Sequence, residues 1–261
     1  MSESQGIQFN KQLFEDDQPQ QTNPATTPGQ SDNRSRLISL IKSADKEGLV
    51  RFLNTLPNPA EIINQRDDSL KQSSIYEAVQ IKDKQLSVEV TELFLEKGGQ
   101  IKIKDVHGQS PLFYISRDGN IPLLNLFLRH SIDINESDNF KQSPLFYASR
   151  DNQVDFVREM LRNGANPNHK DKVNETALFY AAREGHKEIC NILIDGGADV
   201  NILDNKRQTA LYFAKKSKND DLVNFLISKG ALNTKDGKLT KNDLLKMKGG
   251  ILKRRQCRLH K

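Results

Sequence analysis

The chain has 261 residues, of which 36% are hydrophobic, and it contains no Trp. Its length fits one or two compact domains, and no apolar run approaches the roughly eighteen residues that a membrane span needs. Acidic side chains at Glu3, Glu15, Asp16 and Asp17 occupy the region where a signal or transit peptide would be basic. We therefore expect an intracellular protein, cytoplasmic or nuclear, with no membrane partner.

The formal net charge of +5 is concentrated at the C-terminus. Residues 246–261 carry seven basic side chains and no acidic one, which leaves 32 basic against 34 acidic side chains in the rest of the chain. The two cysteines, Cys190 and Cys257, lack the CxxC or Cys/His spacing of a metal site. We expect Cys190 to pack in the core, Cys257 to be a free surface thiol, and the protein to use neither metal nor cofactor.

The N-terminal region is rich in Gln, Asn, Ser, Thr and Pro, a composition that predicts a disordered arm over residues 1–33. Its apolar residues could dock on another surface or could be chance apolar positions in a mobile arm; they are Ile7, Phe9, Leu13 and Phe14. Helical periodicity starts after Ser35, a candidate N-cap, and a second short helix is expected after a break at Gly48.

The stretch from Asp105 to Asn233 contains one motif four times at a spacing of 33 residues. The copies open with "DVHGQSPLFYISRDGN", "DNFKQSPLFYASRDNQ", "DKVNETALFYAAREGH" and "DNKRQTALYFAKKSKN". A fixed period of this length is typical of stacked-repeat proteins, in which each unit buries its apolar face against its neighbours. Upstream, Ala44 lies 34 residues before Ala78, and Ala78 lies 37 before Ile115. Two irregular repeats are thus predicted, the second with an insertion of about four residues near Gln80–Gln85.

Each unit has recognisable helix boundaries. The N-cap candidates are Ser110, Ser143, Thr176 and Thr209, and Pro111 and Pro144 follow at the first helical position. Gly164, Gly197 and Gly230 are placed to end the second helices in the left-handed conformation. The repeated aspartates are expected to accept hydrogen bonds within the turns; they are Asp105, Asp138, Asp171 and Asp204.

At these residues the chain resembles the ankyrin-repeat family, whose motif "D..G.TPLH.AA..GH…L...GADVN" is nearest to "DKVNETALFYAAREGHKEICNILIDGGADVN". The resemblance covers roughly residues 35–235, about six repeats. It implies an all-α solenoid in which each repeat has two antiparallel helices and a projecting turn. The motif histidine is replaced by Phe113, Phe146, Phe179 and Tyr212, where we expect aromatic packing instead. The turn glycine remains at Gly108 and is replaced by Lys141, Asn174 and Arg207.

The predicted domain organisation follows from these boundaries. A repeat array over 34–235 divides into units at about 34–65, 66–104, 105–137, 138–170, 171–203 and 204–235. Thr240 opens a C-terminal cap helix over 236–248, since terminal repeats must shield the exposed core. A basic tail, 249–261, completes the chain.

The sequence gives no indication of catalysis. It contains no P-loop, no GxGxxG after a strand, no HExxH and no GxSxG, and its five histidines are dispersed. His186 occupies a position where ankyrin repeats often carry a structural histidine. We therefore predict no enzyme and no catalytic residue.

Partner binding is expected at the turn tips and the exposed ends of the first helices, which stacking does not fix. The candidate residues are Val106, His107, Arg117, Asn139, Phe140, Arg150, Lys172, Val173, Arg183, Asn205, Lys206 and Lys216. Four of them, Arg117, Arg150, Arg183 and Lys216, recur every 33 residues. They could recognise an acidic segment of another protein, or they could be neutralised by Asp118, Asp151 and Glu184 as weak surface pairs. Phe140 could be a binding hot spot or could fold back onto the neighbouring turn.

The basic tail has three interpretations that the sequence leaves open. Lys253, Arg254, Arg255 and Arg258 could form a nuclear-import signal, a contact to nucleic acid or an acidic protein, or a solubilising end. Our first hypothesis is a non-enzymatic protein-protein interaction module, a scaffold, adaptor or subunit of an assembly that binds its partner through its concave face and turn tips. The alternative is a nucleus-associated protein whose tail contacts nucleic acid or an acidic partner while the repeats hold a chromatin or RNA-processing protein.

Overall fold

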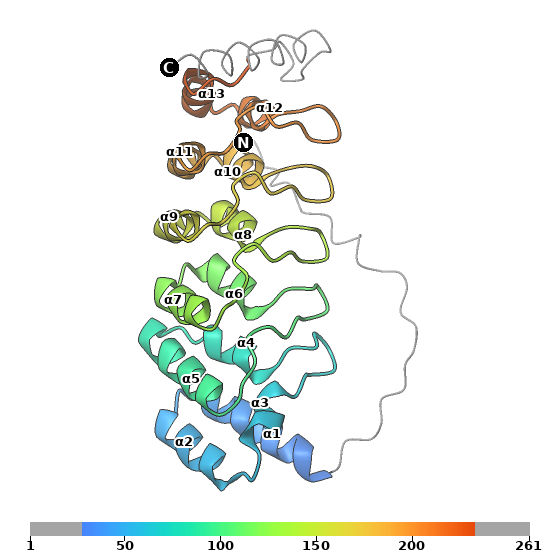
Figure 1. Ribbon diagram of the computed structural model, residues 1–261, viewed down its shortest axis with the longest axis vertical. Coiled ribbons are helices and arrows are strands. Elements are labelled where there is room, and N and C mark those ends of the chain that lie inside the picture. The colour runs from blue at the N-terminus through green and yellow to red at the C-terminus, as the bar shows by residue number, and fades with distance from the viewer. Residues whose placement is uncertain (1–27, 233–261) are drawn as a thin grey trace, which may run out of the picture.

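The computed structural model describes residues 28–232, a range that holds helices and turns and no β-strand. Figure 1 shows the helices stacked in pairs along one long axis, with the connecting turns projecting to one side. The helices are α1 (Pro28–Lys42), α2 (Lys46–Thr55), α3 (Pro59–Asn64), α4 (Ser74–Val79), α5 (Lys84–Glu96), α6 (Pro111–Asp118), α7 (Ile121–Arg129), α8 (Pro144–Arg150), α9 (Val154–Arg162), α10 (Ala177–Glu184), α11 (Lys187–Asp195), α12 (Ala210–Lys216) and α13 (Asp220–Ser228).

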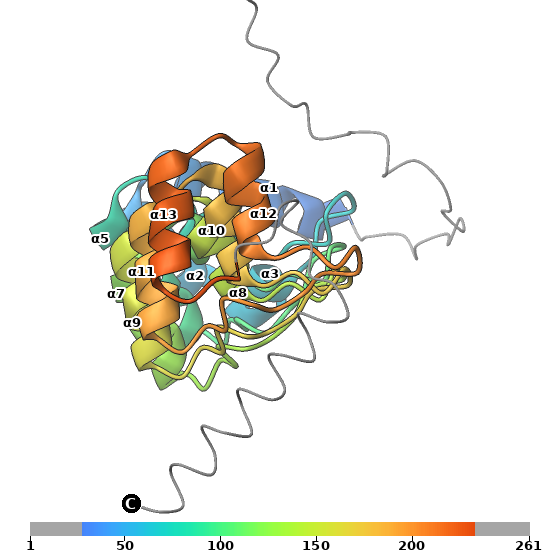
Figure 2. The ribbon, with the colours of Figure 1, turned by 90° about the horizontal axis from the view of Figure 1, so that it is seen from above.

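Two rows of helices build the solenoid. The inner row, which follows the turns, is α4, α6, α8, α10 and α12, and each of these helices packs on the next. Behind it stand α5, α7, α9, α11 and α13 as the outer row, and α1 and α2 form a further pair below α4 and α5. Seen along the stack in Figure 2, the rows superpose and the turns converge on one side. The prediction of an all-α solenoid of about six helix pairs is confirmed.

Aromatic rings of the inner row bind successive repeats together. Phe113, Phe146 and Phe179 are buried, and each lies edge-on to a ring of the following repeat at centroid distances of 5.5, 5.4 and 5.9 Å. Such pairs contribute about 0.5–1.5 kcal/mol beyond their buried area. The expected replacement of the motif histidine by aromatic packing is therefore present.

The boundaries of the regular repeats agree with the sequence. Ser110, Ser143, Thr176 and Thr209 are the N-caps, and the Ser110 hydroxyl accepts a hydrogen bond from the Leu112 N–H. The helix-ending glycines have φ angles of 87°, 97° and 95° at Gly164, Gly197 and Gly230. This is the left-handed conformation that residues without a Cβ adopt at little cost.

The first helix pair begins earlier than predicted. α1 starts at Pro28, so residues 28–33 are helical and Ser35 lies inside the helix instead of capping it. α2 starts at Lys46 after the N-cap Asp45, whose side chain accepts a hydrogen bond from the Gly48 N–H. Gly48 is thus part of the first turn of α2 and does not break the chain. The carboxylate cap, and not the glycine, decides where this helix begins.

The register of this pair also differs from the prediction. Ala44 is exposed, has a φ of 58°, and directly precedes the N-cap, as Gly119 does in the later repeat. The Asp45 N–H donates to the Leu40 carbonyl at 3.1 Å, as the Asn120 N–H donates to the Ile115 carbonyl at 3.2 Å. Leu40, and not Ala44, therefore occupies the place of Ala78.

The insertion in the second repeat lies inside a helix. α5 has 13 residues where α7 has nine, whereas the turn before α5 has the ordinary length. The N-caps Asp83 and Asn120 each follow their reference residues, Ala78 and Ile115, by five positions. The extra residues were predicted near Gln80–Gln85, but they add about one turn to α5, which keeps its buried face in phase.

One short helix, α3, was not predicted; it packs on α1 and α4 ahead of the first projecting turn. The predicted C-terminal cap helix, the basic tail, and residues 1–27 of the predicted arm lie outside the described residues.

Candidate functional site

Each projecting turn is organised by one buried aspartate. Asp138 Oδ1 accepts the backbone N–H groups of Phe140 and Gln142 at 2.8 and 2.9 Å, and the Asp138 N–H donates to the Gln142 carbonyl at 3.0 Å. The turns opened by Asp105, Asp171 and Asp204 repeat this pattern. All four aspartates are only 5–8% exposed. The predicted role of the aspartates is confirmed, and their charges are turned inward, away from the tips.

The turns demand a left-handed residue at their fourth position. Gly108, Lys141, Asn174 and Arg207 have φ angles of 72°, 59°, 63° and 63°. Only glycine reaches this region without strain. Lys141 and Arg207 therefore carry left-handed backbone strain that Gly108 does not.

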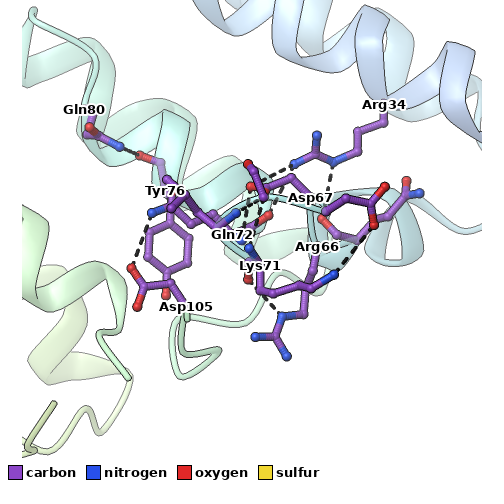
Figure 3. Close-up of polar contacts among 12 residues, drawn as sticks. Arg34, Arg66, Asp67, Lys71, Gln72, Tyr76, Gln80 and Asp105 are labelled. Atoms are coloured by element: carbon purple, nitrogen blue, oxygen red, sulfur yellow. Dashed lines mark hydrogen bonds and ion pairs between the residues drawn. The ribbon is translucent and has the colours of Figure 1, made fainter. Parts of the chain in front are cut away.

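A fifth turn, Asp67–Gln72, precedes the regular four and was not recognised in the sequence. Figure 3 shows Asp67 beside Lys71 and Gln72 of this turn. The Asp67 carboxylate accepts the N–H groups of Leu70, Lys71 and Gln72. Burial raises the pKa of Asp67, but these hydrogen bonds and that from Ser69 outweigh it and leave the pKa below its ordinary value. This turn is one residue longer than the others and α5 is four residues longer than α7, so its aspartate lies 38 residues before Asp105 instead of 33.

Backbone hydrogen bonds connect each tip to the next. Val106 N–H donates to the Leu70 carbonyl, and the same bond joins Asn139 to His107, Lys172 to Phe140, and Asn205 to Val173, all at 2.9–3.0 Å. Each turn contributes two chain segments, and hydrogen-bonded segments lie about 4.8 Å apart, so the tips recur about every 10 Å. The five turns therefore form one continuous edge, which we call the turn-tip edge.

Large apolar side chains are exposed along this edge. Within residues 28–232 the exposed large hydrophobic residues are Leu70, Val106, Phe140 and Val173, with exposed fractions of 42%, 42%, 43% and 47%. They belong to four successive turns. Three of the four were predicted as binding residues, and Leu70 was missed with its turn. The Phe140 ring has the Lys172 ammonium 6.0 Å from its centroid, so this aromatic lies beside the next turn.

Behind the tips of the Asp105, Asp138 and Asp171 turns, a polar network joins each turn to the inner helix of the same repeat and to the preceding turn. The Tyr147 hydroxyl donates to Asp138 Oδ2 at 2.7 Å, and the Gln109 amide donates to both of these groups, at 2.7 and 3.0 Å. Gln72 and Tyr114 make the corresponding contacts one repeat earlier. Burial raises the pKa of Tyr114 to about 12, and hydrogen bonding to Asp105 adds to this. The tyrosine hydroxyls therefore stay protonated and hold the turns in place.

The predicted basic row is present, but three of its members are already engaged. The Arg117 guanidinium lies over the rings of Tyr114 and Tyr147, at 4.9 and 4.6 Å, and donates to Gln109 Oε1. Arg150 forms two hydrogen bonds to Asp151, at 2.8 and 3.1 Å.

Arg183, in the next repeat, stacks on Phe213 at 4.3 Å and pairs with Glu175 at 2.7 Å. The expected neutralisation by a neighbouring helix-end carboxylate thus holds for Arg150, whereas Arg183 uses Glu175 of the adjoining turn and not Glu184. Lys216, the fourth member of the row, is exposed.

A hollow opens at the C-terminal end of this surface. It has a volume of about 250 Å³ and lies between the last two turns and α12. Its lining includes Val173, Arg183, Lys206, Tyr212 and Lys216. Two carboxylates also line it: Glu175 is 7% exposed and bound to Arg183, and Asp204 is 8% exposed and accepts N–H groups of its own turn. The accessible charges around the hollow are therefore positive.

His169 and His186 have structural positions. His186 Nε2 lies 2.9 Å from the Arg150 carbonyl, which links two repeats as the resemblance implied. His169 Nε2 lies 2.9 Å from the Lys141 carbonyl and 3.2 Å from Ser137 Oγ. Cys190 is buried, and burial raises the pKa of its thiol to about 12. Among residues 28–232, no group of three or more His, Cys, Asp or Glu residues is arranged to hold a metal ion.

Comparison with known proteins agrees with this geometry. The family model described as ankyrin repeats (3 copies) matches residues 75–171 and 150–236. No curated protein matched the chain. No helix in the described range is long and apolar enough to cross a membrane. The basic-tail residues Lys253, Arg254, Arg255 and Arg258 lie outside the described residues, and their three interpretations stay predictions.

Proposed function

The chain belongs to the ankyrin-repeat family, and from this premise we propose that it is a non-enzymatic module that holds another protein along its turn-tip edge and inner helices. The observation that carries the proposal is the position of Leu70, Val106, Phe140 and Val173, the exposed large apolar residues of the described range, on four successive tips. Exposed apolar side chains gathered on one edge of a polar protein mark an interaction surface.

The edge is also held rigid before any partner arrives. The aspartate bonds fix each turn, the backbone bonds join each tip to the next, and the Tyr–Gln–Asp network anchors the turns to the inner helices. A surface fixed in this way loses little conformational entropy on binding, so more of the contact energy contributes to affinity.

The engaged arginines fit the same role. A guanidinium stacked on an aromatic ring is oriented but keeps N–H donors on its edge, and Arg117, Arg150 and Arg183 are all partly exposed. We propose that they present directed donors to the partner at the rim of the apolar tips. Within the class of binding modules, we favour a subunit of an assembly, a scaffold or an adaptor.

Affinity capture from native cell extract tests this proposal. The intact chain is compared with Phe140→Ala, Arg150→Ala, Arg183→Ala, and with a control pair, Arg129→Ala, Arg162→Ala, on the outer helices. Both control arginines are about two-thirds exposed. We expect one stoichiometric partner that the intact chain and the control retain and that the triple variant loses, with unchanged far-UV circular dichroism. Equal retention by the triple variant would refute the assignment of this surface.

A further inference from the structure

We infer that the partner binds as an extended acidic segment with an apolar side chain at every third residue, its acidic end over the C-terminal turns. This inference rests on the proposed function and specifies the partner class for the turn-tip edge. It follows from a chemical gradient along the five turns, from the spacing of the tips, and from the hollow beside α12.

The gradient begins with apolar character at the N-terminal turns. Leu70 and Val106 are exposed there, and the one exposed carboxylate of these tips, Asp68, lies 3.6 Å from Lys71. The Asp105 turn carries no other acidic or basic residue, apart from His107. The N-terminal turns therefore favour apolar contacts, and they do not select for a negatively charged partner segment.

The C-terminal turns are cationic. Their exposed charged residues are Lys141, Lys172, Lys206 and Arg207, whereas the carboxylates of the same turns are buried: Asp138, Asp171, Asp204 and Glu175. A partner approaching these tips meets four positive charges without an exposed negative one among the tip residues. Complementary charge on the partner would steer the encounter and fix its direction along the edge.

The hollow beside α12 extends this cationic end inward. Lys206 and Lys216 lie on its lining with the stacked guanidinium of Arg183, and Val173 is at its apolar side. A carboxylate side chain of the partner can enter this space and meet charged donors from two sides. Charge-assisted hydrogen bonds of this kind are about twice as strong as neutral ones.

The spacing of the tips sets the residue period of the partner. An extended peptide advances about 3.3 Å per residue, so three residues cover the roughly 10 Å between tips. Side chains at every third position can therefore contact Leu70, Val106, Phe140 and Val173 in turn. A helical segment advances only about 1.5 Å per residue and would need roughly seven residues between contacts.

Fluorescence anisotropy with defined peptides tests the inference on the full-length chain. The probe is a labelled peptide of about twelve residues with leucine at every third position, serine between them in one half and glutamate in the other. One control peptide has the same composition with the leucines contiguous, and a second has lysine in place of glutamate. The protein variants are Phe140→Ala and the pair Lys172→Ala, Lys206→Ala, with Arg129→Ala, Arg162→Ala as a matched loss of two positive charges.

We expect the probe to bind more tightly than either control peptide. Phe140→Ala should weaken binding about tenfold or more, since central aromatic contacts dominate interfaces. The lysine pair should weaken it by a similar factor at about 0.05 M salt and much less at about 0.5 M, where screening is strong. The control pair should bind like the intact chain.

Three results would overturn the inference: no binding of the probe, equal binding of the contiguous or lysine peptide, or unchanged binding by both edge variants. If these occur while the capture experiment still yields a partner that depends on Phe140, Arg150 and Arg183, the proposed function stands and the partner class is wrong. Failure of both experiments would instead show that the turn-tip edge is not the binding surface.

Discussion

The turns at Asp138 and Asp204 have the same backbone bonds but different chemistry behind them. At Asp138, neutral Gln109 and Tyr147 bridge the turn to the inner helix, and Arg117 donates a hydrogen bond to the side-chain oxygen Oε1 of Gln109. At Asp204 the corresponding residues are Glu175 and Phe213, and Arg183 pairs with the glutamate. One backbone is thus supported either by a hydrogen-bonded amide and phenol or by a buried ion pair.

The difference shows which features of the solenoid are structural and which are free to serve binding. The central repeats fill the space behind the turn with a closed polar network. At the last described turn the tyrosine hydroxyl is replaced by hydrogen, Lys216 takes the place of an arginine, and a cationic hollow opens. The C-terminal end is therefore where a partner can reach behind the tips.

The largest expected effect is the loss of stability when a buried aromatic ring of a central repeat is removed, compared with removal of the half-buried ring of the last described repeat. Phe146→Ala removes a ring that is 2% exposed and contacts the ring of Tyr180. We expect a loss of about 3–5 kcal/mol in the free energy of unfolding. Tyr212→Ala, at the equivalent half-buried position, should cost clearly less. Urea denaturation measures both, and equal losses would show that the central repeat and the last described repeat are packed alike.

Exchanging the acidic and amide residues tests the two modes of support. Gln109→Glu replaces the donor to Asp138 and Tyr147 with a second carboxylate, so we expect a loss of about 2 kcal/mol at neutral pH. Glu175→Gln removes a buried charge but leaves Arg183 stacked on Phe213, and its cost should be smaller. Thermal or urea unfolding measures both variants. A larger loss of stability in Glu175→Gln than in Gln109→Glu would contradict the account.

The burial of Glu175 behind the last described turn also predicts a pH dependence of stability. Burial raises the pKa of Glu175 above its ordinary 4.5, an effect that Arg183 opposes and that Asp171 and Asp204 reinforce. The folded state therefore binds this proton more tightly than the unfolded state. The stability that protonation of Glu175 contributes is fully present below about pH 4.5 and is lost as the pH rises through the pKa of the folded state.

The pH profile of Glu175→Gln provides the check. Stability measured by urea denaturation should fall less steeply with rising pH in this variant than in the intact chain over that window. Identical slopes in the two proteins would show that Glu175 titrates at its ordinary pKa.

The smallest effects are expected at the fourth position of the turns. Lys141→Gly and Arg207→Gly should each change stability by no more than about 1 kcal/mol, because relief of left-handed strain offsets the added flexibility of the unfolded chain. Gly108→Ala should be the opposite case, since its Cβ would lie 2.4 Å from Asn139 Oδ1 at a φ of 72°. Melting temperatures compare the three; stabilisation by Gly108→Ala would contradict the turn geometry.

The sequence predicted the regular repeats because their helix N-caps and turn aspartates recur at a fixed spacing of 33 residues. It failed at the irregular ones for physical reasons. Four extra residues make about one helical turn, so they lengthen α5 without shifting its apolar face. The hydrophobic periodicity of the sequence therefore does not show where they lie. Ala44 sits at a spacing close to one repeat from Ala78 but adopts a left-handed turn conformation that composition does not reveal.

The candidate surface was predicted in part. Val106, Phe140 and Val173 were identified because the repeat shows which turn positions face outward, whereas Leu70 was missed with its longer turn. The stacking of Arg117 between two tyrosine rings and the pairing of Arg183 with Glu175 depend on distances between repeats. The hollow at α12 likewise required the three-dimensional arrangement.

Site-specific photocrosslinking in native extract tests the central claim most directly. A photoreactive residue is placed singly at Val106, Val173 or, as the outer-face control, Arg162. The account predicts one and the same adduct from both turn-tip positions and none of that adduct from Arg162. The same adduct at equal yield from Arg162, or none from either turn-tip position, would contradict the claim that the turn-tip edge is the binding surface.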